Sequence, residues 1–433
     1  VGAQIFTNQT AENIDKIGKQ YYNLNLLVSG NTKSSNYQTQ IICSTAINNH
    51  NSEYQEAINK GYPIYHRSDL LAALIKDYQS IAVAGTHGKT TTSSLIAYML
   101  LECGLDPTVI IGGEVKAWEG NARLGKSPYL VAEADESDGS LVKHHPEFAI
   151  ITNIELDHPD HYESLEQLVN IFQEFSAQSK TVIACIDCPV IKENINATLT
   201  YSLNPDTNAN YIAKNLVHTP YGSQADIWEN GHFLGNISLL LSGDHNISNA
   251  LASIAVGRKL GLEFNIIAEA LSTFEGAKRR FEYKGTYQGS TLIDDYAHHP
   301  SEIRCTLQGA RTRLPQYKAK RLVAIFQPHR YSRTATFLEE FAQCFREADV
   351  VILTDIYSAG ESNTTGINGK IVAETVKKYH DKVYYHSHLS TMTEFLAEFL
   401  QPQDLTLFLG AGNLNQIIPQ LLKLDQESLA QAA

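Results

Sequence analysis

The residues best suited to chemistry are Gly85-Thr86-His87-Gly88-Lys89-Thr90-Thr91, which follow an apolar run and precede a helix-type pattern. Glycines let backbone N–H groups turn inward around phosphate oxygens, and a helix N-terminus adds about half a positive charge. Lys89 can then reach β- and γ-phosphates, and the Thr90 hydroxyl can bind Mg²⁺. The common loop, Gly-x-x-x-x-Gly-Lys-Ser/Thr, would need glycine at Val83, whereas the first glycine here is Gly85. The pattern favours a shortened phosphate-binding loop over an ordinary glycine-rich turn.

Carboxylates gather where the next apolar runs end. Glu133-Ala-Asp-Glu-Ser-Asp138 follows one run, and four carboxylates in six residues repel one another unless a cation neutralises them. Mg²⁺ binds one or two carboxylates beside phosphate oxygens and water, as ATP chemistry requires. A solvated acidic turn is the alternative. The following run ends in Thr152–His161, where His158 is a candidate ligand for a second ion or a hydrogen-bonded loop histidine.

Two later segments carry amides and cations. Gly243-Asp-His-Asn-Ile-Ser-Asn249 opens a helix, and Asn246 and Asn249 share one face of its first turn, where amides can read an adenine edge or simply cap the helix. Lys278-Arg-Arg-Phe281 places three cations at an expected domain junction. Such a cluster is either a solvated face or the source of an arginine that offsets transition-state charge on a γ-phosphate.

Polar and aromatic residues also end successive strands near the C-terminus. In an open α/β sheet this arrangement marks a ligand crevice. The segments are Asp294-Asp-Tyr-Ala-His-His-Pro300, Gln327-Pro-His-Arg-Tyr-Ser-Arg333, Tyr357-Ser-Ala-Gly-Glu361 and Gly410-Ala-Gly412.

The elements that must position these residues form an α/β pattern throughout. Residues 1–80 contain a small βαβ-like series, with expected strands at 40–44 and 63–65 and helices at 53–60 and 69–78. Residues 81 to about 275 continue as strands and helices, with a β-rich stretch at 198–241 and helices at 245–261 and 266–274. From about 278 onward, apolar runs alternate with helical segments and predict a doubly wound, mostly parallel sheet. These runs are 290–294, 321–326, 350–354, 382–385 and 404–409.

Bulk composition narrows the function classes. The 433 residues suggest about three domains, and the net charge of −13 provides no general basic field for nucleic acid or anionic lipid. No apolar run approaches the ~20 residues of a membrane helix, so no integral membrane segment is expected. Six scattered cysteines indicate reduced thiols in a cytoplasm, and the Cys185-x-x-Cys188 pair favours buried apolar thiols over a metal site.

Taken in order, these motifs resemble the Mur ligase family over about residues 1–425. The segments that carry the resemblance are the phosphate loop, Glu133–Asp138, Asn153–His158, His245–Asn249, Lys278–Phe281, Asp294–Pro300 and Gln327–Arg333. It implies an α/β fold of three domains: a Rossmann-like UDP-sugar-binding domain at 1–80, a central ATP-binding P-loop domain at 81–277, and a Rossmann-like C-terminal ligase domain at 278–433.

The resemblance also implies a two-step ligation with ATP and Mg²⁺ as cofactors. The lactyl carboxylate of UDP-N-acetylmuramate attacks the γ-phosphate, and the amine of L-alanine then displaces phosphate from the acyl phosphate. Two alternatives stay open: attachment of a recycled murein peptide to the same UDP-sugar, and a nucleotide-binding module without ligase activity.

Residue roles follow from the same resemblance. Lys89 and Arg280 approach the transferring phosphoryl group. Thr90 and Glu133 hold one Mg²⁺, and His158 helps hold another. Asn249 and His245 face the adenine, and the crevice for nucleotide, sugar or alanine is lined by Asp295, Tyr296, His298, His299, Arg330 and Arg333.

The N-terminal region departs from the family pattern. Members usually open with a first strand and a Gly-x-Gly-Gly-x-Gly turn that holds the UDP diphosphate, and residues 1–80 contain no equivalent. The chain begins with Val1 rather than methionine. We therefore expect an incomplete N-terminal domain.

Overall fold

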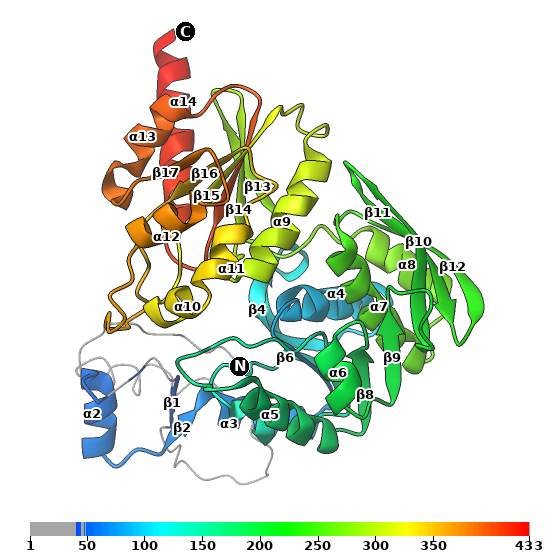
Figure 1. The fold of residues 1–433 in the computed structure, drawn as a ribbon. Helices are drawn as coiled ribbons and strands as arrows, with labels where there is room; N and C mark the ends of the chain where they lie inside the picture. Colours follow the sequence, from blue (N-terminus) through cyan, green and yellow to red (C-terminus); the bar gives the residue numbers. More distant parts are fainter. Residues whose placement is uncertain (1–39, 45–46, 48, 433) are drawn as a thin grey trace.

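The computed structural model describes residues 40–432, except 45, 46 and 48. Two open sheets dominate it, and a small parallel strand pair lies at the N-terminal end (Figure 1). Among the described residues, no helix combines the length and the apolar character needed to cross a membrane.

The N-terminal segment forms the expected βαβ unit. Strands β1 (Ile41–Cys43) and β2 (Ile64–His66) pair in parallel and are connected through helix α2 (Ser52–Asn59). Helix α3 (Arg67–Asp77) follows, with His66 and Asp69 forming a reciprocal capping box. The remaining residues of this region, 1–39, lie outside the described part of the chain.

The central sheet has ten strands, of which the run from β10 to β4 is parallel. Its middle strands are near-continuous apolar runs because helices cover both faces. In spatial order the strands are β12 (His232–Leu239), β11 (Gly222–Glu229), β10 (Tyr211–Thr219), β9 (Leu199–Ser202), β8 (Thr181–Cys185), β7 (Phe148–Ile151), β3 (Gln79–Ala84), β6 (Tyr129–Glu133), β4 (Thr108–Val115) and β5 (Gly120–Arg123).

Alternate residues of these strands divide the core into two layers. Helices α4 (Lys89–Glu102), α7 (Asp244–Lys259) and α8 (Phe264–Ser272) pack on one face. Helix α3, with α5 (Leu165–Ala177) and α6 (Pro189–Asn194), packs on the other. The β-rich stretch expected at 198–241 is β9 followed by the antiparallel meander β10–β12.

The C-terminal sheet is doubly wound, as the sequence predicts. Its order is β13 (Glu282–Tyr287), β14 (Ser290–Asp295), β18 (Asp404–Leu409), β15 (Arg321–Phe326), β16 (Val350–Leu353) and β17 (Val383–Tyr385), and only β13 runs antiparallel to its neighbour. One face carries α9 (Pro300–Arg313), α11 (Leu338–Gln343) and α12 (Gly369–Val376). The other carries α13 (Met392–Phe399) and α14 (Ile417–Ala432).

Short elements complete the architecture. Helix α10 (Tyr331–Thr336) follows β15, and single 3-10 turns lie at Lys116–Trp118, Ser140–Lys143, Leu389–Thr391 and Leu414–Gln416. The edge strands β5 and β13 escaped the sequence patterns because most of their side chains are exposed or only half buried.

The two large sheets meet at a seam beside the phosphate loop. Val115 and Ala277 form an isolated β-bridge, and Lys278 N donates to Glu114 O at 2.8 Å. The N-terminus of α9 reaches the end of β7, where Ser301 Oγ donates to Glu155 Oε2 at 2.9 Å. The carboxyl ends of β3, β6, β7, β14 and β15 therefore supply the side chains of this seam.

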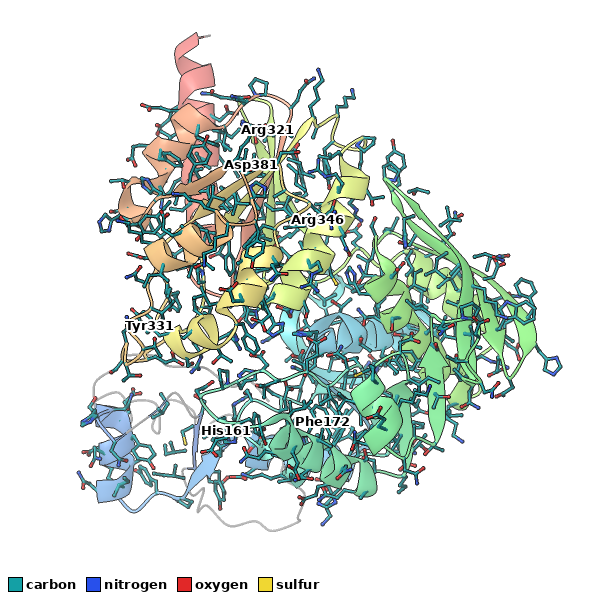
Figure 2. The ribbon with its side chains drawn as sticks, in the orientation of Figure 1. His161, Phe172, Arg321, Tyr331, Arg346 and Asp381 are labelled. Carbon is teal, nitrogen blue, oxygen red and sulfur yellow. The ribbon has the colours of Figure 1, made fainter. Side chains whose placement is uncertain are left out.

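Phe172 tests the core layer between the central sheet and helices α3, α5 and α6. Its ring is fully buried on α5 (Figure 2), so Phe172→Ala should lower the free energy of unfolding by about 3–5 kcal/mol. Urea denaturation followed by circular dichroism measures this loss. Leu124→Ala is the control, because Leu124 is 69 % exposed and its truncation should change stability by less than about 0.5 kcal/mol. Equal losses of stability in both variants would contradict the placement of Phe172 in the core.

Candidate active site

The phosphate loop requires glycine at both of its bends. Gly85 follows β3 with φ +135°, and a Cβ there would lie 2.1 Å from Thr152 Oγ1. Gly88 precedes α4 with φ +81°, and a Cβ there would lie 2.9 Å from Asn249 Oδ1. These close approaches and left-handed conformations exclude larger residues, since only glycine adopts such φ values freely.

The strand end that follows β7 fixes the loop's shape. Asn153 Oδ1 accepts from His87 N at 2.8 Å, and Thr152 Oγ1 donates to His87 O at 2.6 Å. Thr86 Oγ1 donates to Glu155 O at 3.0 Å. The loop is thus held from outside by residues 152–155 and does not depend on its own contacts alone.

Lys89 lies inside the curve of the loop. Its Nζ donates to Gly85 O at 2.7 Å and to Thr86 O at 3.2 Å, and lies 2.9 Å from Glu136 Oε2. Burial alone would lower the pKa of Lys89, but the carboxylates of Glu136, Asp135 and Glu133 outweigh burial and raise it. The ammonium therefore stays charged at neutral pH.

One pair of predicted metal ligands is brought together directly. Thr90 Oγ1 donates to Glu133 Oε1 at 3.2 Å, and Gly112 N donates to Glu133 Oε2 at 2.8 Å. Arg280 Nη2 approaches Thr90 Oγ1 at 3.5 Å from the other side of the seam. A hydroxyl and a carboxylate oxygen beside a phosphate loop are donors that suit Mg²⁺.

The third predicted ligand belongs to a separate group. His158, Asp135 and Glu136 each offer a ligand atom, and these atoms lie within 4.8 Å of one another. Glu136 is 1 % exposed, and its Oε2 accepts no aligned hydrogen bond despite its closeness to Lys89 Nζ. Two carboxylates and one imidazole fit a divalent cation, and Mn²⁺ or Mg²⁺ is compatible with the set.

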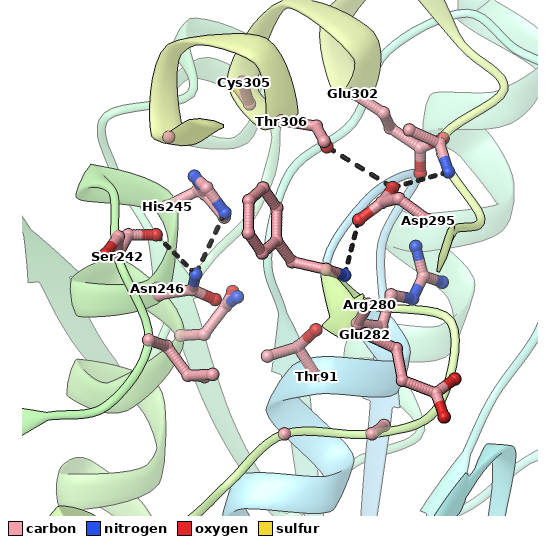
Figure 3. Close-up of a pocket in the computed structure, with 18 of the residues that line it drawn as sticks. Thr91, Ser242, His245, Asn246, Arg280, Glu282, Asp295, Glu302, Cys305 and Thr306 are labelled. Carbon is pink, nitrogen blue, oxygen red and sulfur yellow. Dashed lines mark hydrogen bonds between the residues drawn. The ribbon is translucent and has the colours of Figure 1, made fainter. Parts of the chain in front are cut away.

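A pocket of about 1050 Å³ opens next to the loop, between the two sheets. Figure 3 shows Thr91 below it, His245 and Asn246 on one side, and Arg280 and Asp295 on the other. Of the predicted residues, those lining it are His87, Gly88, Thr91, His245, Asn246, Asn249, Arg280 and Asp295. The pocket combines amides, an exposed histidine and the Phe281 ring.

The two asparagines of α7 take different places. Asn249 is buried against the phosphate loop, and its Oδ1 accepts from Thr92 Oγ1 at 3.0 Å. Asn246 Nδ2 donates to Ser242 O at 2.8 Å, beside His245 Nε2 at 3.1 Å (Figure 3). Asn249 therefore braces the loop from the pocket wall, while Asn246 and His245 lie further out.

The basic segment forms the connection between the sheets. Arg279 Nε donates to Asp294 Oδ2 at 3.2 Å, and the guanidinium groups of Arg279 and Arg280 lie 4.8 and 5.4 Å from the Tyr296 ring centre. Asp295 accepts from Phe281 N and Ala297 N, each at 2.8 Å. Burial raises the pKa of Asp295 to about 6, with Arg280 opposing the rise. Asp295 and Tyr296 thus hold the connection that carries Arg280.

His87 connects the phosphate loop to α9. Its Nε2 lies 3.1 Å from Glu155 Oε2, and its Nδ1 lies 3.4 Å from Glu302 Oε1. Burial alone would lower the pKa of His87, but these two carboxylates outweigh burial and raise it to about 9. The hydrogen bond from His87 lowers the pKa of Glu155 to about 2. The arrangement is an imidazolium between two carboxylates.

The paired histidines of the C-terminal crevice pack beside this network. His299 caps α9 through Nδ1, and its ring centre lies 4.7 Å from that of His87. His298 Nδ1 lies 3.0 Å from Tyr296 O, and its ring meets that of His329 at 5.9 Å. Burial lowers the pKa of His298 to about 3 and that of His299 to about 4, so both rings are neutral.

Arg330 and Arg333 are already engaged by carboxylates. Arg330 Nη1 donates to Asp160 Oδ2 at 2.9 Å and to Glu361 Oε1 at 3.1 Å. Arg333 is 2 % exposed and forms a bidentate pair with Asp157. Both arginines therefore tie the C-terminal sheet to the loop that follows β7, and neither lines the pocket.

Several residues of the site were not singled out from the sequence. They are Asp135, Glu136, Asn153, Glu155, Asp157, Ser301 and Glu302. Most lie inside or next to the acidic and histidine-containing segments that the sequence analysis names, so the sequence does indicate this region of the site. Choosing among neighbouring carboxylates needed side-chain direction across the seam, which spacing alone does not give.

The His87 network predicts a pH-dependent contribution to stability. The folded-state pKa of about 9 exceeds the ordinary 6.5, so the contribution is complete below pH 6.5 and is lost as pH rises through 9. The wild-type advantage over His87→Gln should fall by up to about 3 kcal/mol between pH 6 and 9.5. Urea unfolding at several pH values measures it, and a pH-independent difference would contradict the paired imidazolium.

Three family models match the chain in succession. They are "Mur ligase family, catalytic domain" over residues 1–79, "Mur ligase middle domain" over 83–257, and "Mur ligase, glutamate ligase domain" over 279–412. The first match shows that the family's N-terminal domain is represented in residues 1–79. The expected lack of a glycine-rich diphosphate turn concerns mainly residues outside the described part, and it stays a prediction.

Curated relatives match over most of the chain. A UDP-N-acetylmuramate–L-alanine ligase of Gloeothece citriformis is 63% identical over 90% of this chain and 79% of its own length. One of Microcystis aeruginosa is 57% identical over 99% of this chain and 88% of its own.

Solved structures agree on the architecture. A UDP-N-acetylmuramate–alanine ligase of Thermotoga maritima has a TM-score of 0.77 at 28% identity, covering 90% of this chain and 85% of that one. A murein peptide ligase of Psychrobacter arcticus, at 22% identity and a TM-score of 0.65 over 89% and 85% of the two chains, shows the same fold. The three-domain α/β architecture, the sequence matches and the phosphate loop agree, and the chain belongs to the Mur ligase family.

Proposed function

We propose that this protein ligates L-alanine to UDP-N-acetylmuramate at the expense of ATP, giving UDP-N-acetylmuramoyl-L-alanine, ADP and phosphate. The observation that carries the proposal is a phosphate loop, with its partly buried Lys89, between acidic strand ends and an arginine from the connection between the two sheets. The substrates are those named for relatives at 57–63% identity. The reaction would belong to the synthesis of peptidoglycan precursors.

The chemistry balances in two steps. A carboxylate oxygen of the sugar attacks the γ-phosphorus, the bond to the β-phosphate oxygen breaks, and ADP leaves. The amine of L-alanine then attacks the acyl carbon, loses a proton, and expels phosphate. A carboxylate and a triphosphate repel each other, so the first step needs fixed cations at the point of contact.

The residues divide these tasks in our proposal. Lys89 and Arg280 neutralise charge on the transferring phosphoryl group, and the N–H groups of residues 85–91 hold the phosphates. Thr90 with Glu133, and His158 with Asp135 and Glu136, would each hold a Mg²⁺ ion. Bound there, Mg²⁺ supplies charge neutralisation between ATP and the acceptor. His245, Asn246 and Asn249 border the space proposed for the base.

Domain limits and location are part of the proposal. The limits are 1–80, 81–277 and 278–433, and they are supported by the separate hydrogen-bonded sheets and by the bridge at Ala277. A cytoplasmic location is supported by six cysteines that are all free thiols in the structure. His298, His299, Arg330 and Arg333 are proposed to border the acceptor crevice.

The choice of acceptor tests the reaction. The purified chain is incubated with ATP, Mg²⁺ and UDP-N-acetylmuramate, and either L-alanine or an L-alanyl-γ-D-glutamyl-diaminopimelate tripeptide. We expect phosphate release and a new UDP-sugar-alanine mass only with L-alanine. Release with tripeptide alone would indicate the murein-peptide ligase instead. ATP binding without product in either case would leave only the nucleotide-binding module.

Lys89→Met tests the phosphoryl-transfer role. Methionine retains a flexible side chain of similar length without the charge, so kcat should fall by about 100- to 1000-fold. Steady-state phosphate release measures the loss, and Lys192→Met on helix α6 serves as the control with unchanged kcat. Loss of the Lys89 ammonium also leaves Glu136 uncompensated, so circular dichroism must first show that the variant is folded. A folded Lys89→Met variant with wild-type kcat would refute the assigned role.

A further inference from the structure

The pair formed by Arg333 and Asp157 stands out among the contacts across the seam. Arg333 Nε donates to Asp157 Oδ1 at 2.8 Å, and Nη2 donates to Asp157 Oδ2 at 3.2 Å. Arg333 is 2 % exposed and Asp157 is 4 % exposed, so both charges are removed from water. Removing one partner of such a pair leaves an uncompensated buried charge, which is strongly unfavourable.

Asp157 in turn controls the backbone of its neighbour. Its Oδ1 accepts from His158 N at 2.7 Å, and His158 has φ +55°, a left-handed conformation that non-glycine residues seldom adopt. The same carboxylate therefore binds the arginine and holds His158 in a conformation that needs outside support.

The loop is also held at residues that follow His158. Arg330 Nη1 donates to Asp160, and the Tyr162 hydroxyl donates to Glu136 O. The Tyr162 contact links the loop to the acidic segment that supplies Asp135 and Glu136. The His158 loop is thus placed relative to the acidic segment by contacts that include two arginines of the C-terminal domain, both at helix α10.

We propose that Arg333 and Asp157 are positioning residues that place the His158 imidazole for a divalent cation, so that the C-terminal domain controls cation affinity in the central domain. The inference rests on the cation site proposed for His158, Asp135 and Glu136. Arg333 itself does not touch the cation. It acts through Asp157, and the pair matters because it crosses from one domain to the other.

Mn²⁺ binding to the full chain without nucleotide tests the proposal. Electron paramagnetic resonance resolves free and bound Mn²⁺, and His158→Gln identifies the class of sites that depends on this imidazole. Asp157→Asn and Arg333→Met should weaken that class by about 10- to 100-fold, as loss of groups that orient metal ligands does. The double variant should bind no more weakly than the weaker single variant, because both residues act through one contact.

A second readout follows the loop without any metal. Hydrogen exchange of residues 155–161 should accelerate in Asp157→Asn and Arg333→Met. Arg321→Met is the matched control, since Arg321 forms a bidentate pair with buried Asp404 at 2.7 and 2.6 Å, at the opposite end of strand β15 (Figure 2). It should alter neither the exchange of the 155–161 loop nor Mn²⁺ affinity.

The possible failures are distinguishable. If His158→Gln removes no class of Mn²⁺ sites, the cation site is wrong and the inference falls with it. If that class exists and the Asp157→Asn variant, shown to be folded by circular dichroism, binds Mn²⁺ as the wild type does, the positioning role is refuted while the cation site stands. The ligation assay with L-alanine is independent of both results.

Discussion

The pairing of Lys89 with Glu136 inside the phosphate loop is the interaction on which the site depends. An ammonium of this kind is costly to bury, and it is held by two loop carbonyls and by a carboxylate that is itself 1 % exposed. Each group is tolerable only because the other is present. The glycines at 85 and 88 allow the loop to take this shape, because both have positive φ and both are closely approached by the side chains of Thr152 and Asn249.

The same principle extends across the seam between the sheets. His87 lies between Glu155 and Glu302, Arg333 pairs with Asp157, and Arg279 pairs with Asp294. Such pairs, of which Arg333–Asp157 is fully buried and the others are partly buried, add little net stability compared with apolar packing, but loss or misplacement of one partner costs free energy. They therefore suit an interface whose two sides, the central and the C-terminal domain, must pack in one register. The phosphate loop and the C-terminal sheet are aligned mainly by charge. The apolar clusters mostly stabilise the separate layers, although Leu156 of the central domain also packs against the C-terminal cluster.

How far the sequence predicts this arrangement depends on the range of the interactions. Buried parallel strands such as β3 and β15 are apolar runs, so their positions are local properties of the chain. The phosphate loop is equally local, since Gly-Lys-Thr must follow a strand and open a helix. The closeness of Thr90 and Glu133 could also be predicted from the sequence, because parallel strands end at one edge of a sheet.

The partners of individual charged and polar side chains could not be predicted in this way. Arg333 reads as a crevice residue, yet its guanidinium is taken by Asp157, 176 positions earlier in the chain. Asn249 reads as an adenine contact, yet its amide oxygen is bound to Thr92. In both cases the motif identifies the right region, but the direction of the side chain is decided by a surface from another part of the chain. Spacing carries no information about that surface.

Joining two anions explains why so many of these partners come from opposite sides of one seam. Cations fixed permanently in one domain would bind carboxylate and triphosphate tightly but would gain little as charge shifts during transfer. Arg280 and Arg333 both belong to the C-terminal side, and they reach Thr90 and the neighbour of His158 respectively. The cationic environment of the phosphate loop therefore includes these arginines only when the C-terminal domain is packed against the central domain. In the proposed mechanism, placement of that domain then becomes part of the chemistry, because it brings the Arg280 guanidinium to the side of the phosphate loop.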